Sequence, residues 1–219
     1  MKRKAMPIIL SALIILSLTA VYLMYIFNFI PHKKYDNSDF GITAYISPAD
    51  KDSDGTDDQT DILNSAREYV SRRPKYKSKY YSSGYPDDNY GVCTDVIAFA
   101  LKSAGYDLME LLSADVEKNP AVYGIEKPDK SIDFRRVKNL RVYFERTAVS
   151  LTCDVSDISE WQGGDIVFFK KHIGIVSDKR NKNGVPFVIH HASPLQRYYE
   201  EDILERRNDI TGHYRIGTK

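Results

Sequence analysis

The sequence predicts an α+β domain that follows an N-terminal membrane-spanning helix. Three observations lead to this prediction. An uncharged apolar run occupies residues 7–30, the middle of the chain has apolar residues at helical spacing, and the last third has short apolar runs separated by polar turns. The chain has 219 residues, which is enough for one domain and an appendage.

The apolar run is the first predicted element. It exceeds the roughly 20 residues that a helix needs to cross a bilayer, and it ends in bulky residues rather than in a small-residue cleavage site. We therefore expect residues 1–34 to be a signal anchor, with cleavage as a signal peptide as the alternative. The basic residues Lys2, Arg3 and Lys4 favour a cytoplasmic N-terminus. The sequence thus predicts a single-pass protein of the cell membrane, in contact with the bilayer through residues 7–30, with an extracytoplasmic globular part.

Residues 35–61 are expected to form a linker that ends in an acidic loop. Aspartates stand at positions one, three, five, nine and twelve of the window 50–61, and a glycine stands at position six. This is the spacing of an EF-hand calcium loop, in which alternate side chains converge on one cation. A structural calcium ion is therefore one hypothesis, and an acidic disordered linker is the other. The ligands would be Asp50, Asp52, Asp54, the carbonyl of Thr56, Asp58 and Asp61.

The residues after the acidic loop predict a series of helices. Apolar positions predict a helix that starts near Asp61, which could cap it. A second helix should begin at Cys93 and end at Gly105, and residues 107–124 and 129–151 should add further helices. Because helix N-termini carry partial positive charge, they lower the pKa of a thiol in the first turn. Cys93 is thus either a reactive thiol or a small core residue, and Cys153 is expected to be buried.

Strands follow residue 161. Residues 165–169, 172–178 and 185–191 predict three antiparallel strands, with Gly174 allowing close backbone approach. If Ser177 pairs with Val185, His172 lies opposite His190 on one face of the sheet. A slip by one residue would put His191 there instead.

The order of these motifs resembles a known class of enzymes. A cysteine that opens a helix, then "GDIVFF", "HIGIV" and a histidine at the end of the next strand are similar to the NlpC-type peptidoglycan peptidases of the papain-like superfamily. The longer stretches "GVCTDV", "PDKSIDFRRVKNL", "WQGGDIV", "HIGIVSD", "VIH" and "GHYR" resemble more closely an uncharacterised bacterial family, domain of unknown function 1287. At the cysteine, NlpC enzymes usually read Asp-Cys-Ser-Gly, whereas this chain reads "VCTD".

The resemblance implies a function for residues 62–219. They would form a papain-like catalytic domain with N-terminal helices packed on a small antiparallel sheet. Cys93 would attack an amide carbonyl, His172 would exchange the proton, and His190, or its rival His191, would orient the imidazole. Tyr90 would assist the oxyanion. The implied activity is that of a cysteine peptidase or amidase that cleaves cell-wall peptides or another amide and requires no cofactor for catalysis.

Other readings remain open. Asp165 is expected to fix a turn rather than to catalyse. The net charge of +1 provides no basic excess to neutralise phosphates, so no nucleic-acid partner is expected. A calcium-stabilised cell-surface binding module without turnover is the alternative function, and a zinc site with Cys93, His172 and His190 as ligands is a third hypothesis.

Overall fold

The computed structural model describes residues 2–217, with side chains from residue 7 onward. The helices are α1 (Lys2–Ile26), α2 (Asp58–Ser71), α3 (Cys93–Ser103), α4 (Leu108–Lys118), α5 (Pro120–Tyr123), α6 (Lys130–Asp133) and α7 (Val137–Thr147), with 3₁₀ turns η1 (Asn37–Phe40) and η2 (Leu204–Arg206). The strands are β1 (Lys75–Tyr76), β2 (Tyr90–Gly91), β3 (Val149–Ser150), β4 (Ile166–Phe169), β5 (His172–Arg180), β6 (Pro186–Ile189), β7 (Glu200–Glu201) and β8 (Ile210–Arg215). This order confirms the predicted α+β class, with all strands except the short β1 and β2 after the helices.

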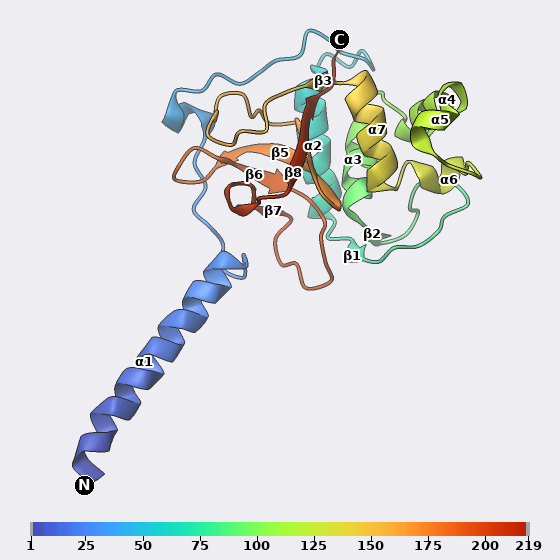
Figure 1. Ribbon diagram of the computed structural model, residues 1–219. Helices are drawn as coiled ribbons and strands as arrows, with labels where there is room; N and C mark the ends of the chain where they lie inside the picture. Colours follow the sequence, from blue (N-terminus) through green and yellow to red (C-terminus); the bar gives the residue numbers. More distant parts are fainter. Residues whose placement is uncertain (1, 218–219) are drawn as a thin grey trace.

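The main sheet is antiparallel and has the strand order β3-β8-β4-β5-β6-β7. Strand β8 pairs with β4 in the middle of the sheet, although it is the last element of the chain. Helices α2, α3 and α7 lie together beside the sheet, and α4, α5 and α6 form an outer group (Figure 1). The short strands β1 and β2 pair in parallel and lead into α3.

Both faces of the sheet are buried. In β4, Ile166 and Phe168 pack into the core shared with the helices, whereas Val167 and Phe169 pack into a second core on the other face. This alternation follows from the period of two in a strand, which sends successive side chains to opposite faces. Buried Trp161 covers the second core from the loop before β4.

A buried polar network joins the turn before β4 to β8. The Asp165 carboxylate accepts hydrogen bonds from the backbone N–H of Gln162 at 2.9 Å, from Nε of Arg215 at 2.7 Å and from Nε2 of Gln59 at 2.8 Å. Nε2 of His213 lies 3.0 Å from the same carboxylate, and its ring stacks on Trp161. Because a buried carboxylate needs such partners, the network fixes the turn. The prediction that Asp165 is a turn-fixing residue is confirmed.

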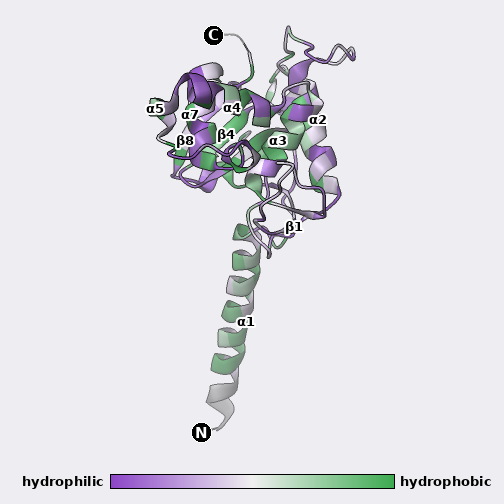
Figure 2. Cartoon of the chain, turned by 90° about the vertical axis from the view of Figure 1, so that its right-hand side faces the viewer, coloured by the Kyte–Doolittle hydropathy of each residue, from purple (hydrophilic) through white to green (hydrophobic). Residues whose placement is uncertain are grey.

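Helix α1 projects from the domain as a separate rod (Figure 1; Figure 2 shows its apolar colouring). The stretch Pro7–Ile26 has 20 residues and a mean hydropathy of 2.3, and none of it is buried inside the protein. It is therefore long and apolar enough to cross a membrane, a property that signal sequences near the N-terminus share.

The segment between α1 and α2 packs on the domain. Tyr35 forms an antiparallel bridge with Arg180, and Nε2 of Gln162 donates to the carbonyl of Thr43. The N-cap of α2 is Asp57, whose side chain accepts from the backbone N–H groups of Gln59 and Thr60. The prediction that Asp61 caps this helix is wrong, because α2 begins at Asp58, four residues before the first apolar position, Ile62.

The register of β5 and β6 also differs from the predicted one. Ile175 pairs with Ile189 and Val176 with Val188, and the register then shifts before Arg180. The predicted pairing of Ser177 with Val185 is wrong by two residues, because β5 runs on past Asp178. An even shift keeps each side chain on its face of the sheet, so His172 and His190 still share a face.

Candidate functional site

The amino end of α3 is fixed by a buried ion pair. Oδ2 of Asp95 accepts a hydrogen bond from the backbone N–H of Val92 at 2.8 Å, which caps the helix. The same carboxylate binds Nε and NH2 of Arg135 at 2.6 and 2.9 Å, and both side chains are almost fully buried. Arg135 also donates to the carbonyl of Lys79 at 2.6 Å, which ties the Tyr-rich loop to the helix start. Cys93 is the first residue of this clamped helix.

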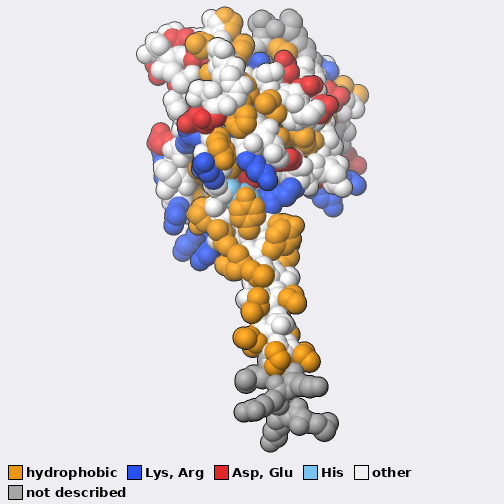
Figure 3. Space-filling view, turned by 90° about the vertical axis from the view of Figure 1, so that its left-hand side faces the viewer, with side chains coloured by type: hydrophobic (Ala, Val, Ile, Leu, Met, Phe, Trp, Pro, Cys, Tyr) orange, Lys and Arg blue, Asp and Glu red, His pale blue; other side chains and the backbone are white. Residues whose placement is uncertain are grey.

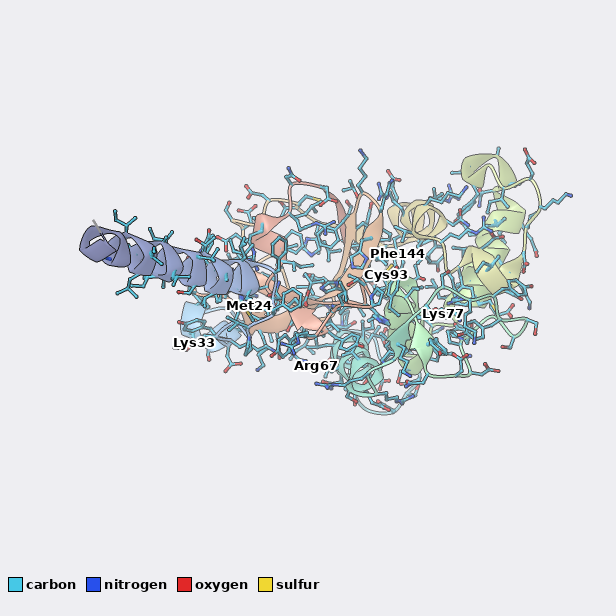
Figure 4. All side chains as sticks on the ribbon, turned by 90° about the horizontal axis from the view of Figure 1, so that it is seen from below. Met24, Lys33, Arg67, Lys77, Cys93 and Phe144 are labelled. Atoms are coloured by element: carbon cyan, nitrogen blue, oxygen red, sulfur yellow. The ribbon has the colours of Figure 1, made fainter. Side chains whose placement is uncertain are left out.

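The thiol of Cys93 lies between α3 and the sheet (Figure 4). Backbone N–H groups of Ile173, Thr94 and Cys93 itself face the sulfur and favour the thiolate, but burial and the charge of Asp95 oppose them. Burial is the largest effect and raises the pKa of the thiol to about 11. The expected lowering by the helix N-terminus is therefore outweighed by desolvation. Cys153, predicted to be buried, is instead exposed, because it lies in the loop between β3 and β4.

A chain of three side chains runs across β5, β6 and β7. Nε2 of His172 lies 3.0 Å from Nδ1 of His190, and Nε2 of His190 lies 3.1 Å from Oε2 of Glu201. Glu201 pairs with Val188 and so shares a sheet face with His190. Burial lowers the pKa of both imidazoles to about 3 and raises the pKa of Glu201 to about 7. Both histidines are thus neutral near pH 7.

Strands β5 and β6 approach closely at Gly174, next to the two histidines. A Cβ atom on Gly174 would lie 2.4 Å from Cγ1 of Val188, 3.1 Å from the carbonyl oxygen of Ile189 and 3.3 Å from Cβ of His190. No larger residue fits there without moving β6. The prediction that Gly174 permits close backbone approach is confirmed.

The hydrogen-bonded series ends at His172, one residue before a backbone amide that faces the thiol. Ile173, whose amide faces the sulfur, is the residue after His172. Within the residues that the structure describes, the thiol makes no hydrogen bond to a histidine, and Nδ1 of His172 has no partner. The ring of His172 instead stacks on Phe169, its partner in β4, with 6.0 Å between ring centroids.

His191 and the tyrosines occupy the surroundings. The ring of His191 packs edge-on against Tyr76 and Tyr199, and its buried Nδ1 has no hydrogen-bond partner among the described residues. Burial and, to a lesser extent, the nearby Cys93 sulfur raise the pKa of the Tyr76 hydroxyl, so Tyr76 lies near the thiol. Tyr90 lies one strand away, with the ammonium groups of two lysines over its ring, Lys77 and Lys79.

The acidic loop forms a separate cluster. Asp50, Asp52 and Asp54 each offer an oxygen, and these atoms lie within 4.8 Å of one another, the one such group of His, Cys, Asp or Glu in the described part of the chain. Burial and the neighbouring aspartates raise the pKa of Asp61 to about 6, and its buried Oδ2 has no hydrogen-bond partner there. Asp58 is held elsewhere, by the backbone N–H of Lys51 at 2.7 Å and by the hydroxyl of Tyr106.

Two parts of this site escaped sequence reasoning. Glu201 lies in an unmarked stretch, "YYEEDI", and only the pairing of β7 with β6 places it beside His190. Arg135 lies in the family motif "PDKSIDFRRVKNL", but nothing in the spacing of that motif indicates that its ion-pair partner is Asp95, 40 residues away.

Comparison with known proteins identifies relatives. The family described as "Domain of unknown function (DUF1287)" matches residues 63–216. The chain is 34% identical over 171 residues to the uncharacterized protein YijF of Escherichia coli (strain K12), covering 72% of this chain and 82% of the relative. No solved structure matches the chain significantly.

Proposed function

The chain belongs to the DUF1287 family, and on this premise we propose that its globular part is a membrane-anchored, extracytoplasmic cysteine hydrolase, a peptidase or amidase of papain-like fold. The carrying observation is the hydrogen-bonded series Glu201–His190–His172, which ends next to the residue whose amide faces the Cys93 thiol. A nucleophile, a base and an orienting group in series are the parts that acyl transfer needs.

While Glu201 is ionised, the donors and acceptors of this series match in only one direction. If the Glu201 carboxylate accepts from Nε2–H of His190, then Nδ1 of His190 is an acceptor for Nε2–H of His172. Nδ1 of His172 is then unprotonated and can take the thiol proton. Since the thiol and both imidazoles are neutral at rest, the proton leaves Cys93 during attack rather than before it.

The reaction then follows in two acyl-transfer steps. Sγ of Cys93 bonds to the amide carbonyl carbon while the thiol proton moves to Nδ1 of His172. The imidazolium passes this proton to the leaving nitrogen, the C–N bond breaks, and a thioester remains. Water, deprotonated by His172, hydrolyses the thioester and restores the thiol. The first amides of α3, those of Cys93 and Thr94, have no intrahelical partner and are suited to stabilise the oxyanion.

The proposed substrate is a cell-wall peptide, because the anchored domain would face the cell wall. The test is to incubate the full chain in detergent micelles with purified cell-wall fragments and to identify products by mass. We expect Cys93→Ala and His172→Ala each to abolish turnover, with the double variant little worse, since residues that act as a unit are non-additive. Cys153→Ala is the matched control and should retain activity.

The orienting residue is tested in the same assay. His190→Ala should cost less than His172→Ala, and His191→Ala should cost least. Wild-type hydrolysis by Cys93→Ala would overturn the assignment. Greater damage from His191→Ala than from His190→Ala would show that the series through His190 is not the operating one. The alternative function, a binding module without turnover, predicts fragments that are retained but chemically unchanged.

We also propose that the acidic loop holds a structural calcium ion. Asp61 supports this, because burial and the charges of the three clustered aspartates raise the pKa of its carboxyl, and its Oδ2 has no hydrogen-bond partner in the described residues. A divalent cation there would offset the mutual repulsion of four carboxylates. The ligands would be Asp50, Asp52, Asp54 and Asp61 with the carbonyl of Thr56, whereas Asp58 supports the loop through Lys51 and Tyr106.

A further inference from the structure

The domain is fixed directly to the end of α1. The ring of His32 stacks on Tyr25 with 3.8 Å between ring centroids, and its Nδ1 lies 2.9 Å from Oδ2 of Asp202. Arg206 donates to the carbonyl of Ile26 at 2.7 Å, one of the last acceptors of the helix. Figure 4 shows the end of α1 near Met24 in contact with the domain rather than on a free tether. The face of the domain around this joint therefore keeps its position relative to α1.

The length of α1 sets the depth of that face. The 20 residues of Pro7–Ile26 rise about 1.5 Å each and so span about 30 Å, the thickness of the hydrocarbon core. The residues that follow Ile26 then lie at the level of the lipid headgroups. Asn28 and Pro31 from this segment line a cavity of about 440 Å³, together with residues of α2 and of the β6–β7 segment.

The cavity carries an excess of positive charge. Lys34, Arg67, Arg73 and Arg197 line it, against the single acidic residue Glu200. Glu200 is already bound by Lys34 and Arg67. Arg73 and Arg197 are exposed and have no ion-pair partner among residues 7–217. Figure 3 shows Lys and Arg side chains gathered where the apolar helix meets the domain.

We propose that this cavity binds the phosphate of an anionic phospholipid of the bilayer that α1 crosses, with Arg73 and Arg197 as its charge-bearing contacts. The two free guanidinium groups supply donors in the fork geometry that suits phosphate. The headgroup depth favours a lipid over a soluble anion, because bilayer phosphates surround this point of the chain. The inference rests on α1 as a membrane span and is independent of the proposed hydrolase.

The test measures lipid binding by the full chain in detergent micelles that contain equal amounts of phosphatidylglycerol and phosphatidylcholine, with native mass spectrometry as the readout. Each basic residue near an anionic surface contributes ~1 kcal/mol. Arg73→Gln/Arg197→Gln should therefore weaken phosphatidylglycerol binding about 30-fold. The matched control is Lys127→Gln/Lys138→Gln, which removes two exposed charges from the helical side of the domain and should bind as the wild type does.

Several outcomes would overturn the proposal. These are equal retention of the two lipids by the wild type, unchanged binding by the arginine variant, and an equal loss in the lysine control. Displacement of the lipid by millimolar inorganic phosphate would show a soluble-anion site instead. Unchanged melting temperatures in both variants, measured alongside, would show that a loss of binding is not a loss of folding.

Discussion

Glu201 should make turnover fall as the pH decreases through about 7. Burial raises the pKa of this carboxyl, and the nearby charges of Arg206 and His32 only partly oppose the effect. A raised pKa means that the group is protonated below about 7. A protonated Glu201 would donate to Nε2 of His190, so Nδ1–H of His190 would donate to His172. His172 would then carry its proton on Nδ1 and could not accept the proton of Cys93.

The size of the effect follows from the titration curve. At pH 6 about one tenth of the molecules would have Glu201 ionised, and at pH 5 about one hundredth. Turnover of cell-wall fragments by the full chain should thus drop about tenfold per pH unit below about 7. The imidazole pKa values of about 3 and the thiol pKa of about 11 lie outside this range. No other member of the series should therefore cause the decrease in turnover below about pH 7.

The variant Glu201→Gln tests this prediction. An amide oxygen still accepts from His190 but does not titrate, so the drop below about 7 should disappear. Turnover at pH 8 should fall about tenfold, because a neutral acceptor is weaker than a charged one. Glu200→Gln is the matched control, since Lys34, Ser177 and Arg67 lower the pKa of Glu200 to about 2 against the effect of its burial.

The assay records initial rates from pH 5 to 8.5 for the wild type and both variants, with the melting temperature at each pH. If turnover by Glu201→Gln still decreases below about pH 7 while the fold is intact, the role of Glu201 is refuted. If Glu200→Gln abolishes the decrease equally, the role is refuted as well, because the decrease would then depend on any substitution in β7 and not on the hydrogen-bond series.

Gly174→Ala should lower the free energy of unfolding by about 1–3 kcal/mol, because the new Cβ overpacks β6; denaturant titration measures this, and an effect as small as that of Gly217→Ala, whose Cβ has room, would contradict it. Calcium at about 5 mM should raise the melting temperature by roughly 2–8 °C relative to chelator, for an affinity typical of extracellular loops. Asp52→Asn should remove this shift, and no shift in the wild type would argue against the site. Iodoacetamide at pH 7.5 should label Cys93 more slowly than Cys153, as peptide mass analysis would detect, since the Cys93 thiol is protonated at rest; faster labelling of Cys93 would indicate a preformed thiolate. The intact protein should stay in membranes after an alkaline carbonate wash, and a soluble species that starts beyond residue 30 would show cleavage instead.

Local patterns alone were enough for the types of α3 and of the three strands β4, β5 and β6. Apolar residues at helical spacing around Val96 and Leu101 predicted α3, and short apolar runs separated by polar turns predicted β4 to β6. The period of two placed His172 and His190 on one sheet face, and this survived a register error of two residues, since an even shift preserves the face. Cys93 at a helix start was readable for the same reason: the apolar pattern begins there.

Tertiary structure decided the quantities that depend on distant partners. Glu201 joins His190 only because β7 folds back onto β6, and Arg135 reaches Asp95 across 40 residues. The direction of the thiol pKa was also beyond local reasoning. A helix N-terminus lowers it by a local dipole, but the desolvation that outweighs this dipole comes from packing α3 against β5, which is a property of the assembled core.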